Sequence, residues 1–138
     1  MSRTHDVSWA AGFFDGEGWI SIQERHHKTY FGHYLRIGIN HVAPAPLYEM
    51  RRLFGGTVTF SDKVIGNRKP RYRWVTSTQN AAGALSQMLP YMRNKSQVSA
   101  LALDFQKTVQ KNKIVVSHEV LETRMNIKRE IQRLNSLD

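Results

Sequence analysis

Four short segments in which apolar and polar residues alternate constrain the fold more than any other feature of this sequence. Alternation with a period of two predicts β-strands that bury one face and leave the other in contact with solvent. A sheet of this kind, with its core on one side only, is typically antiparallel. The residues expected on the buried faces are Ile20, Ile22, Leu35, Ile37, Ile39, Val58, Phe60, Tyr72 and Trp74.

Helical patterns precede, separate and follow these strands. Ser8 can cap a first helix, which the stretch Gly16-Glu17-Gly18 would end. A second helix is expected between the second and third strands. The rest of the chain has helical spacing, with a break at Pro90, a candidate cap at Asn94 and a last helix over residues 117–133. The predicted fold is therefore α+β, in the order αββαββα(α), with residues 1–138 as a single domain.

The polar faces of the predicted strands carry cations, amides and hydroxyls but no acid. Arg can read guanine, and Asn or Gln can read adenine, by paired hydrogen bonds in the major groove. The same cations can contact phosphate. One sign of charge throughout favours a nucleic-acid platform over a merely solvated face. With Lys28 in the first connection, the residues expected to contact DNA are Ser21, Gln23, Arg25, Lys28, Tyr34, Arg36, Asn40, Thr57, Thr59, Arg71 and Arg73.

The net charge agrees with a polyanionic partner. Lys and Arg total 20 against 11 acids, a formal charge of +9. Cysteine is absent, which excludes disulfides and thiolate metal sites. No apolar run approaches the roughly 18 residues of a membrane span, and the first residues lack the apolar stretch of a signal peptide. We therefore expect an intracellular protein that binds neither membranes nor a small-molecule substrate, whether in a prokaryotic or phage cytoplasm or in an organelle matrix.

The most specific stretch is Ala10 to Gly18, which resembles the nine-residue LAGLIDADG motif of homing endonucleases. Ala11, Gly12, Asp15 and Gly18 match the motif, while Gly16 and Glu17 are accepted small and acidic replacements. A strand predicted directly after the motif and the αββαββ order extend the resemblance. Residues 84–95 are also similar to the family's helix, Pro-aromatic turn and following lysine, and the similarity continues through residues 97–105.

The small residues of the motif suit pairing with a second copy of the chain. Gly12 and Gly16 are four residues apart, so they share a helix face and leave backbone exposed there. Small residues at that spacing let two helices approach closely. The homodimer interface is therefore expected to include Ala11, Gly12, Asp15 and Gly16. Three aromatic residues, Trp9, Phe13 and Phe14, are expected to anchor the helix in its own subunit.

The resemblance also implies an active site at the end of this helix. It assigns metal binding to the carboxylate of Glu17 and the backbone carbonyl of Gly16, with Mg²⁺ as the metal and Mn²⁺ as its substitute. Oxygen ligands of this kind suit Mg²⁺. Lys95 falls on the family's active-site lysine, which positions the attacking water or stabilises transition-state charge. Asp15 is expected to have a local structural role rather than to bind metal.

A polar residue near the end of the second strand completes the family's active site. Asn40 and His41 both occupy that region, and we favour His41 as the catalytic residue. Some relatives also place an Arg early in the next helix, where this chain has Ala43-Pro44-Ala45-Pro46, so that role is absent or supplied elsewhere. Six histidines without cysteines or recognised ligand spacing give little support to structural zinc.

The resemblance implies a homodimeric, metal-dependent endonuclease that cuts double-stranded DNA at a long, near-palindromic site and leaves 3′ overhangs. The leading alternative is a non-catalytic nucleic-acid binder on the same fold, such as an intron RNA maturase or a regulator, because fold alone does not fix function. A basic nuclease without sequence preference is a further alternative. Retention of Glu17 and Lys95 favours the nuclease, since a binder has no need of an acid beside phosphate.

Overall fold

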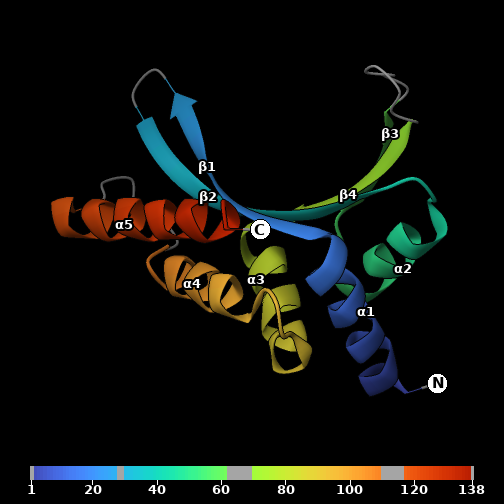
Figure 1. Cartoon of the computed structure of the whole chain (residues 1–138). Coiled ribbons are helices and arrows are strands. Elements are labelled where there is room, and N and C mark those ends of the chain that lie inside the picture. The colour runs from blue at the N-terminus through green and yellow to red at the C-terminus, as the bar shows by residue number, and fades with distance from the viewer. Residues whose placement is uncertain (1, 28–29, 62–69, 110–116, 138) are drawn as a thin grey trace.

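A curved four-stranded sheet with all its helices on the convex side makes up the molecule (Figure 1). The computed structural model describes residues 2–27, 30–61, 70–109 and 117–137. The element order confirms the predicted α+β fold. The elements are α1 (Arg3–Glu17), β1 (Gly18–His27), β2 (Tyr30–His41), α2 (Ala45–Phe54), β3 (Thr57–Ser61), β4 (Arg71–Ser77), α3 (Thr78–Met88), the 3₁₀ turn η1 (Leu89–Tyr91), α4 (Ser96–Lys107) and α5 (His118–Asn135).

The sheet is antiparallel throughout, in the order β1-β2-β4-β3. Ile20 lies opposite Ile37, and Ile39 lies opposite Trp74, so these apolar side chains share the face that the helices cover. All four are buried, and the Trp74 indole N–H also donates to the Gly55 carbonyl at 2.8 Å. The alternation in the sequence therefore predicted the buried face of the three longer strands.

The outer end of β3 differs from the expectation that Phe60 is buried. Phe60 has the predicted parity, opposite Tyr72, yet it is 56% exposed. The reason is visible in Figure 1, where β3 and the adjoining end of β4 rise beyond the helices. There the Phe60 and Tyr72 rings pack on each other, with their centroids 4.8 Å apart.

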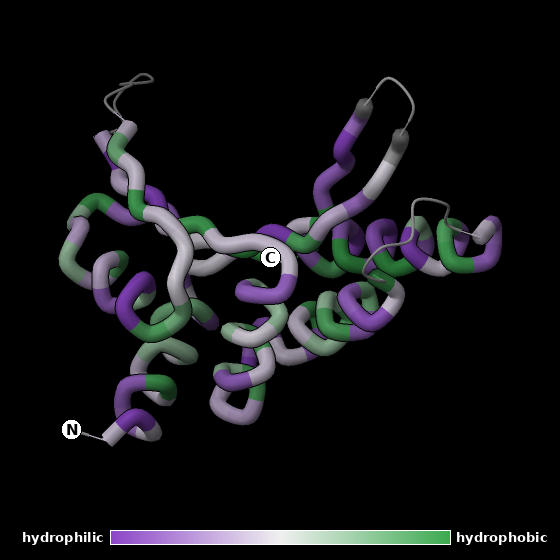
Figure 2. The backbone as a smooth tube through the Cα atoms, turned by 180° about the vertical axis from the view of Figure 1, so that it is seen from behind, coloured by the Kyte–Doolittle hydropathy of each residue, from purple (hydrophilic) through white to green (hydrophobic). Residues whose placement is uncertain are grey.

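The helices bury regular apolar stripes against the sheet. In α3 the buried residues include Ala81, Ala84, Leu85 and Met88, the spacing of one helix face. Viewed from behind, the helices carry both hydrophobic and hydrophilic segments, as expected of helices that bury one face (Figure 2). In the part of the chain that the structure describes, no helix is long and apolar enough to cross a membrane.

Helix α1 begins earlier than predicted. Its N-cap is Ser2, whose hydroxyl accepts a hydrogen bond from the His5 amide at 3.3 Å, so the prediction that Ser8 caps the helix is wrong. No Gly or Pro interrupts residues 3–11, and the buried stripe starts one turn before the motif, at Val7. The added turns carry Asp6, an acid in the first turn that complements the helix dipole.

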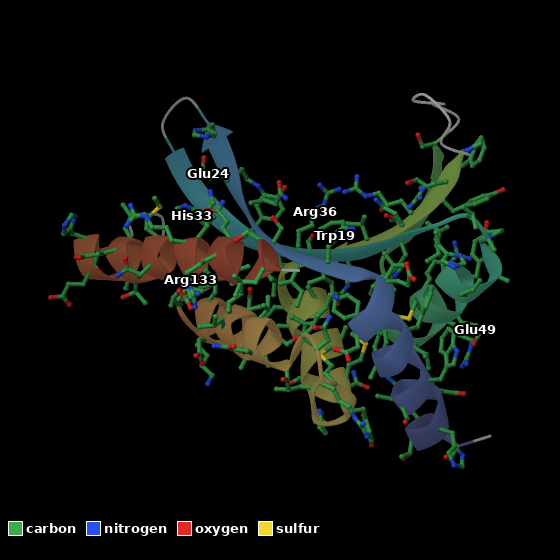
Figure 3. All side chains as sticks on the ribbon, in the orientation of Figure 1. Trp19, Glu24, His33, Arg36, Glu49 and Arg133 are labelled. Carbon is green, nitrogen blue, oxygen red and sulfur yellow. The ribbon has the colours of Figure 1, made fainter. Side chains whose placement is uncertain are left out.

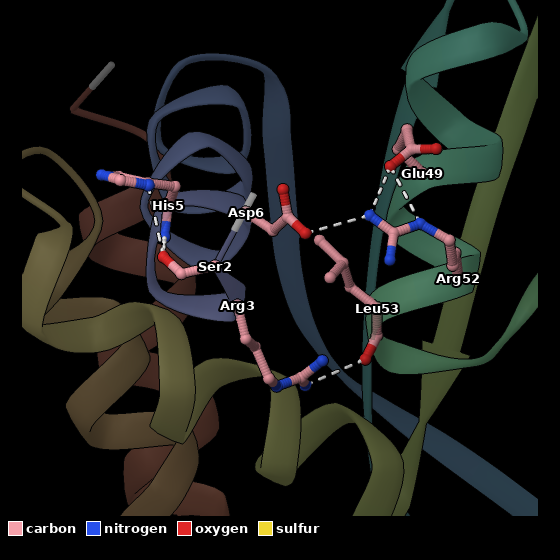
Figure 4. A network of polar contacts seen from close by, with 7 residues as sticks. All are labelled: Ser2, Arg3, His5, Asp6, Glu49, Arg52 and Leu53. Carbon is pink, nitrogen blue, oxygen red and sulfur yellow. Dashed lines mark hydrogen bonds and ion pairs between the residues drawn. The ribbon is translucent and has the colours of Figure 1, made fainter.

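These added turns fix α1 against α2 (Figure 4). The Arg52 guanidinium donates to Asp6 at 3.2 Å and to Glu49 at 2.8 Å, while Arg3 donates to the Leu53 carbonyl at 3.2 Å. Solvent screens exposed pairs of this kind, so each stabilises the fold little. They set the direction of α1 more than they stabilise the fold.

Candidate active site and nucleic-acid interface

Helix α1 ends where the concave face of the sheet begins. Its C-cap is Gly18, whose amide donates to the Phe14 carbonyl and which is also the first residue of β1. A Cβ at Gly18 would collide with the buried Phe14 ring, so only glycine permits this tight junction. Glu17 is therefore the last residue of the helix, and its side chain is exposed.

Asp15 binds the turn that precedes α4. Its carboxylate accepts hydrogen bonds from the backbone amides of Arg93 at 3.0 Å, Asn94 at 2.9 Å and Lys95 at 2.7 Å. Burial alone would raise the pKa of this carboxyl, but the three amides and the Lys95 charge outweigh burial and hold the pKa below its ordinary value. This confirms the structural role expected of Asp15, because its oxygens are occupied within the chain.

Lys95 lies at the same junction. It is the N-cap of α4, a position predicted for Asn94, and its ammonium donates to the Asp15 carbonyl at 2.9 Å. Asn94 instead directs its side-chain amide to the same carbonyl at 3.3 Å. A helix C-terminus attracts cations, so the end of α1 favours an ammonium there. Two segments about 80 residues apart in sequence thus bring Lys95 to the helix turn that carries Glu17.

A single chain offers few metal ligands at this point. Among the described residues no three His, Cys, Asp or Glu side chains form a group that could hold a metal ion. Glu17 supplies one exposed carboxylate. The Gly16 carbonyl has no amide of α1 four residues ahead to bond, because residue 20 already lies in β1. One carboxylate and one carbonyl fit Mg²⁺, which usually keeps several waters and adds substrate phosphates.

The two candidates for the polar active-site residue near the end of β2, Asn40 and His41, lie on opposite faces of the sheet. Asn40 lies opposite Arg73 on the concave face and is exposed. His41 lies on the other face, opposite Tyr72, and its ring packs edge-on against Phe13 with centroids 5.4 Å apart. The His41 Nδ1 atom is also 3.1 Å from both the amide nitrogen and the carbonyl oxygen of Ala43, which fixes the ring.

The concave face gathers the polar residues predicted to contact DNA. In the register, Ser21 lies opposite Arg36, and both Asn40 and Thr59 lie opposite Arg73, so the four strands share one polar face. No acid occupies a described position of this face. Lys28 lies outside the described residues. The others on this face are Gln23, Arg25, Tyr34, Thr57 and Arg71, with the Arg25 guanidinium 4.6 Å from the Tyr34 ring centre.

One residue of this face was missed because only polar positions were counted. Trp19 has the same parity as Ser21, and it lies opposite Gly38 on the concave side, close to Arg36 (Figure 3). The alternation in the sequence predicts this position, because Trp19 lies two residues before Ser21 and therefore on the same face. A large aromatic side chain at this position is not needed for the core, which lies on the other side of the sheet.

The face of α1 turned away from the rest of the chain is partly apolar. Phe14 is fully buried, as predicted, but Trp9 is 44% exposed, so the expectation that Trp9 anchors the helix in its own subunit is wrong. Trp9 instead stacks on Phe13, with ring centroids 5.5 Å apart. Both glycines of this face, Gly12 and Gly16, are exposed, and a Cβ on either would touch nothing within 4 Å. Ala11, by contrast, lies in the chain's own core.

Known structures share this architecture. The homing endonuclease I-CvuI, solved in complex with its target in the presence of 2 mM Ca, is 20% identical; the match covers 95% of this chain and 82% of that one, with a TM-score of 0.77. The archaeal intron-encoded homing endonuclease I-Vdi141I, complexed with DNA, is 11% identical over 96% and 86%, with a TM-score of 0.78. The meganuclease I-SmaMI, bound to uncleaveable DNA, is 17% identical over 91% of this chain but only 44% of its own, with a TM-score of 0.72.

Neither a family model nor a curated protein matches the sequence. The structural likenesses nevertheless show that the chain has a homing endonuclease fold. More closely, it is the LAGLIDADG homing endonuclease fold, as the stretch Ala10 to Gly18 predicted: this stretch forms the end of α1 and the first residue of β1, where the four-stranded sheet begins.

Proposed function

We propose that this protein is a site-specific, metal-dependent endonuclease that hydrolyses both strands of duplex DNA. One observation carries the proposal: α1 ends in an exposed Glu17 at the border of a polar sheet face with no acid among its described residues, and Lys95 is bound to the same helix turn. A carboxylate beside a surface suited to phosphate is costly for a binder, because like charges repel. It is useful when a cation bridges the carboxylate and the phosphate.

Glu17 and the Gly16 carbonyl would hold Mg²⁺, for which Mn²⁺ would substitute. The chemistry that such an ion would supply when bound is activation of a water and stabilisation of the leaving oxygen in an in-line displacement. Lys95 would place a positive charge beside the phosphate that is cut, and Asp15 holds the Lys95 backbone in position for this. His41 would contact the hydrated site from the end of β2, with Asn40 as the alternative on the concave side.

The active unit would be a homodimer built on α1. Gly12 and Gly16 leave the exposed face of this helix flat, and Trp9 and Phe13 add apolar surface beside them. Pairing two copies there would place two Glu17 residues near the two-fold axis and join the two concave faces. A two-fold protein recognises half-sites related by the same symmetry. We therefore propose a near-palindromic target, cut at its centre with 3′ overhangs.

The decisive experiment is selection of cut sites from a randomised duplex library in Mg²⁺. Wild type is compared with Glu17→Gln and with Glu119→Gln, a control that removes an exposed acid from α5 instead. We expect wild type and Glu119→Gln to cut one near-palindromic site. Glu17→Gln should bind that site with equal or higher affinity and leave it intact.

Two results would contradict the proposal. Selective binding without cleavage, in Mg²⁺ and in Mn²⁺, would identify a non-catalytic binder, and preferential binding of RNA would point to a maturase. If Glu17→Gln cleaves DNA at the wild-type rate, Glu17 is not the metal ligand.

A further inference from the structure

Trp19 occupies a slot on the concave face that exists only because its neighbour is glycine. The indole lies across Gly38, its partner in the β1–β2 register. A Cβ on Gly38 would lie 2.5 Å from Cζ2 of the indole and 2.5 Å from the Trp74 carbonyl oxygen. The absence of a side chain at this position lets the ring lie directly against the sheet.

Two guanidinium groups pack beside this indole. The Cζ atom of Arg73 is 5.0 Å from the Trp19 ring centre, and that of Arg36 is 5.9 Å away. Guanidinium groups favour the electron-rich face of an aromatic ring, and tryptophan is the most favourable partner. Arg36 comes from β2 and Arg73 from β4, the two central strands of the sheet.

The two arginines are held together without a counter-charge among the described residues of this face. Burial lowers the pKa of Arg73, and the neighbouring Arg36 charge lowers it further. The buried Nε of Arg73 has no hydrogen-bond partner in the described part of the chain. Trp19 therefore restrains two mutually repelling cations in a fixed place, which favours a ligand that presents electronegative acceptors there.

We propose that Trp19 is a positioning residue that aims Arg36 and Arg73 at guanine in the base pairs next to the cleavage position. The inference rests on the proposed function. In the proposed complex, the central strands of the concave sheet would face the groove of the duplex, and the phosphates would run toward the rims of the sheet. The O6 and N7 atoms of guanine form the paired acceptor that an arginine fork reads. Trp19 follows Glu17 by two residues, so the cluster adjoins the proposed cleavage chemistry.

The test is a binding selection from the randomised duplex library in EDTA, where no metal-dependent cleavage occurs. It compares wild type with Trp19→Ala, Trp19→Phe and the matched control Tyr48→Ala, which removes an exposed, arginine-contacting aromatic residue of α2, away from the concave face. We expect wild type to select guanine at one or two central positions of each half-site. Trp19→Ala should weaken that preference by about 5- to 150-fold, and Trp19→Phe should retain most of it.

The control and the salt dependence separate the possible explanations. Tyr48→Ala should leave the central guanine preference unchanged. If Trp19→Ala weakens binding equally for all sequences and flattens the salt dependence, the cluster contacts phosphate, and the inference is overturned. Unchanged central preference in Trp19→Ala overturns it as well. If wild type selects no duplex DNA at all, the proposed function fails, and the inference fails with it.

Discussion

Lys95 donates two hydrogen bonds to Asp15, one from its backbone and one from its side chain. The Lys95 amide donates to the Asp15 carboxylate at 2.7 Å, and the Lys95 ammonium donates to the Asp15 carbonyl at 2.9 Å. The first bond fixes the backbone of the turn before α4, and the second fixes the side chain over the end of α1. The stability of this junction and the position of the proposed catalytic lysine therefore depend on the same residue.

Replacing Asp15 with Asn should lower the free energy of unfolding by about 1–2 kcal/mol at pH 7, because three amides lose a charged acceptor. The effect should depend on pH. The folded-state pKa of Asp15 is depressed, so its contribution is present above the unfolded-state value, about 3.9, and is lost as pH falls through the lower folded-state value.

Urea unfolding curves of both proteins, recorded at one fixed protein concentration from pH 7 to pH 3, measure this dependence. The difference between wild type and Asp15→Asn should shrink below about pH 4. A difference that stays constant across this range would show that the ionised carboxylate does not stabilise the turn.

Replacing Lys95 with Ala should reduce the rate of DNA cleavage by about 10²–10³-fold at saturating protein, the usual effect of removing one donor to a transition-state charge. The fold should be little affected, because the backbone amide of residue 95 still bonds Asp15. Single-turnover cleavage of the selected site measures the change. Lys107→Ala, which removes an exposed cation at the other end of α4, should cleave normally.

The opposite faces of Asn40 and His41 allow their roles to be separated. His41→Ala should reduce cleavage about 10-fold or more while keeping base preference, if His41 contacts the hydrated metal site as proposed. Asn40→Ala should relax base preference, because Asn40 lies with Arg73 on the concave face. Cleavage rates and selected sites for both variants measure the two effects. An inverted result would assign the catalytic role to Asn40.

Replacing Gly12 with Leu should block dimerisation without harming the folded monomer. A side chain at Gly12 meets nothing within 4 Å in its own chain, so a loss can be attributed to the partner copy. Sedimentation velocity should show a shift from dimer to monomer, with loss of double-strand cleavage. Gly83→Leu is the matched control, because Gly83 is an exposed helical glycine of α3 with equally open surroundings. A Gly12→Leu protein that stays dimeric and active would exclude pairing through α1.

The sequence alone determined most of the local elements, because their signals are short-range, although the start of α1 and the cap of α4 differ from the prediction. Alternation placed Ile37 and Trp74 on the buried face and Arg36 and Arg73 on the other. Ser117 was expected to begin the last helix and does cap it, since its hydroxyl accepts the Val120 amide at 3.3 Å. Such bonds join residues a few positions apart, so a single pattern in the chain specifies both partners.

Only the tertiary structure decided which distant residues meet. Nothing near Asp15 in sequence indicates that its carboxylate caps a turn 78 to 80 residues later. The position of Trp19 likewise depends on β1 pairing in a register that puts Gly38 beneath the indole. The exposure of Trp9 depends on which side of α1 the other helices cover. These are long-range contacts, and their geometry follows from how whole elements pack rather than from the residues of either segment alone.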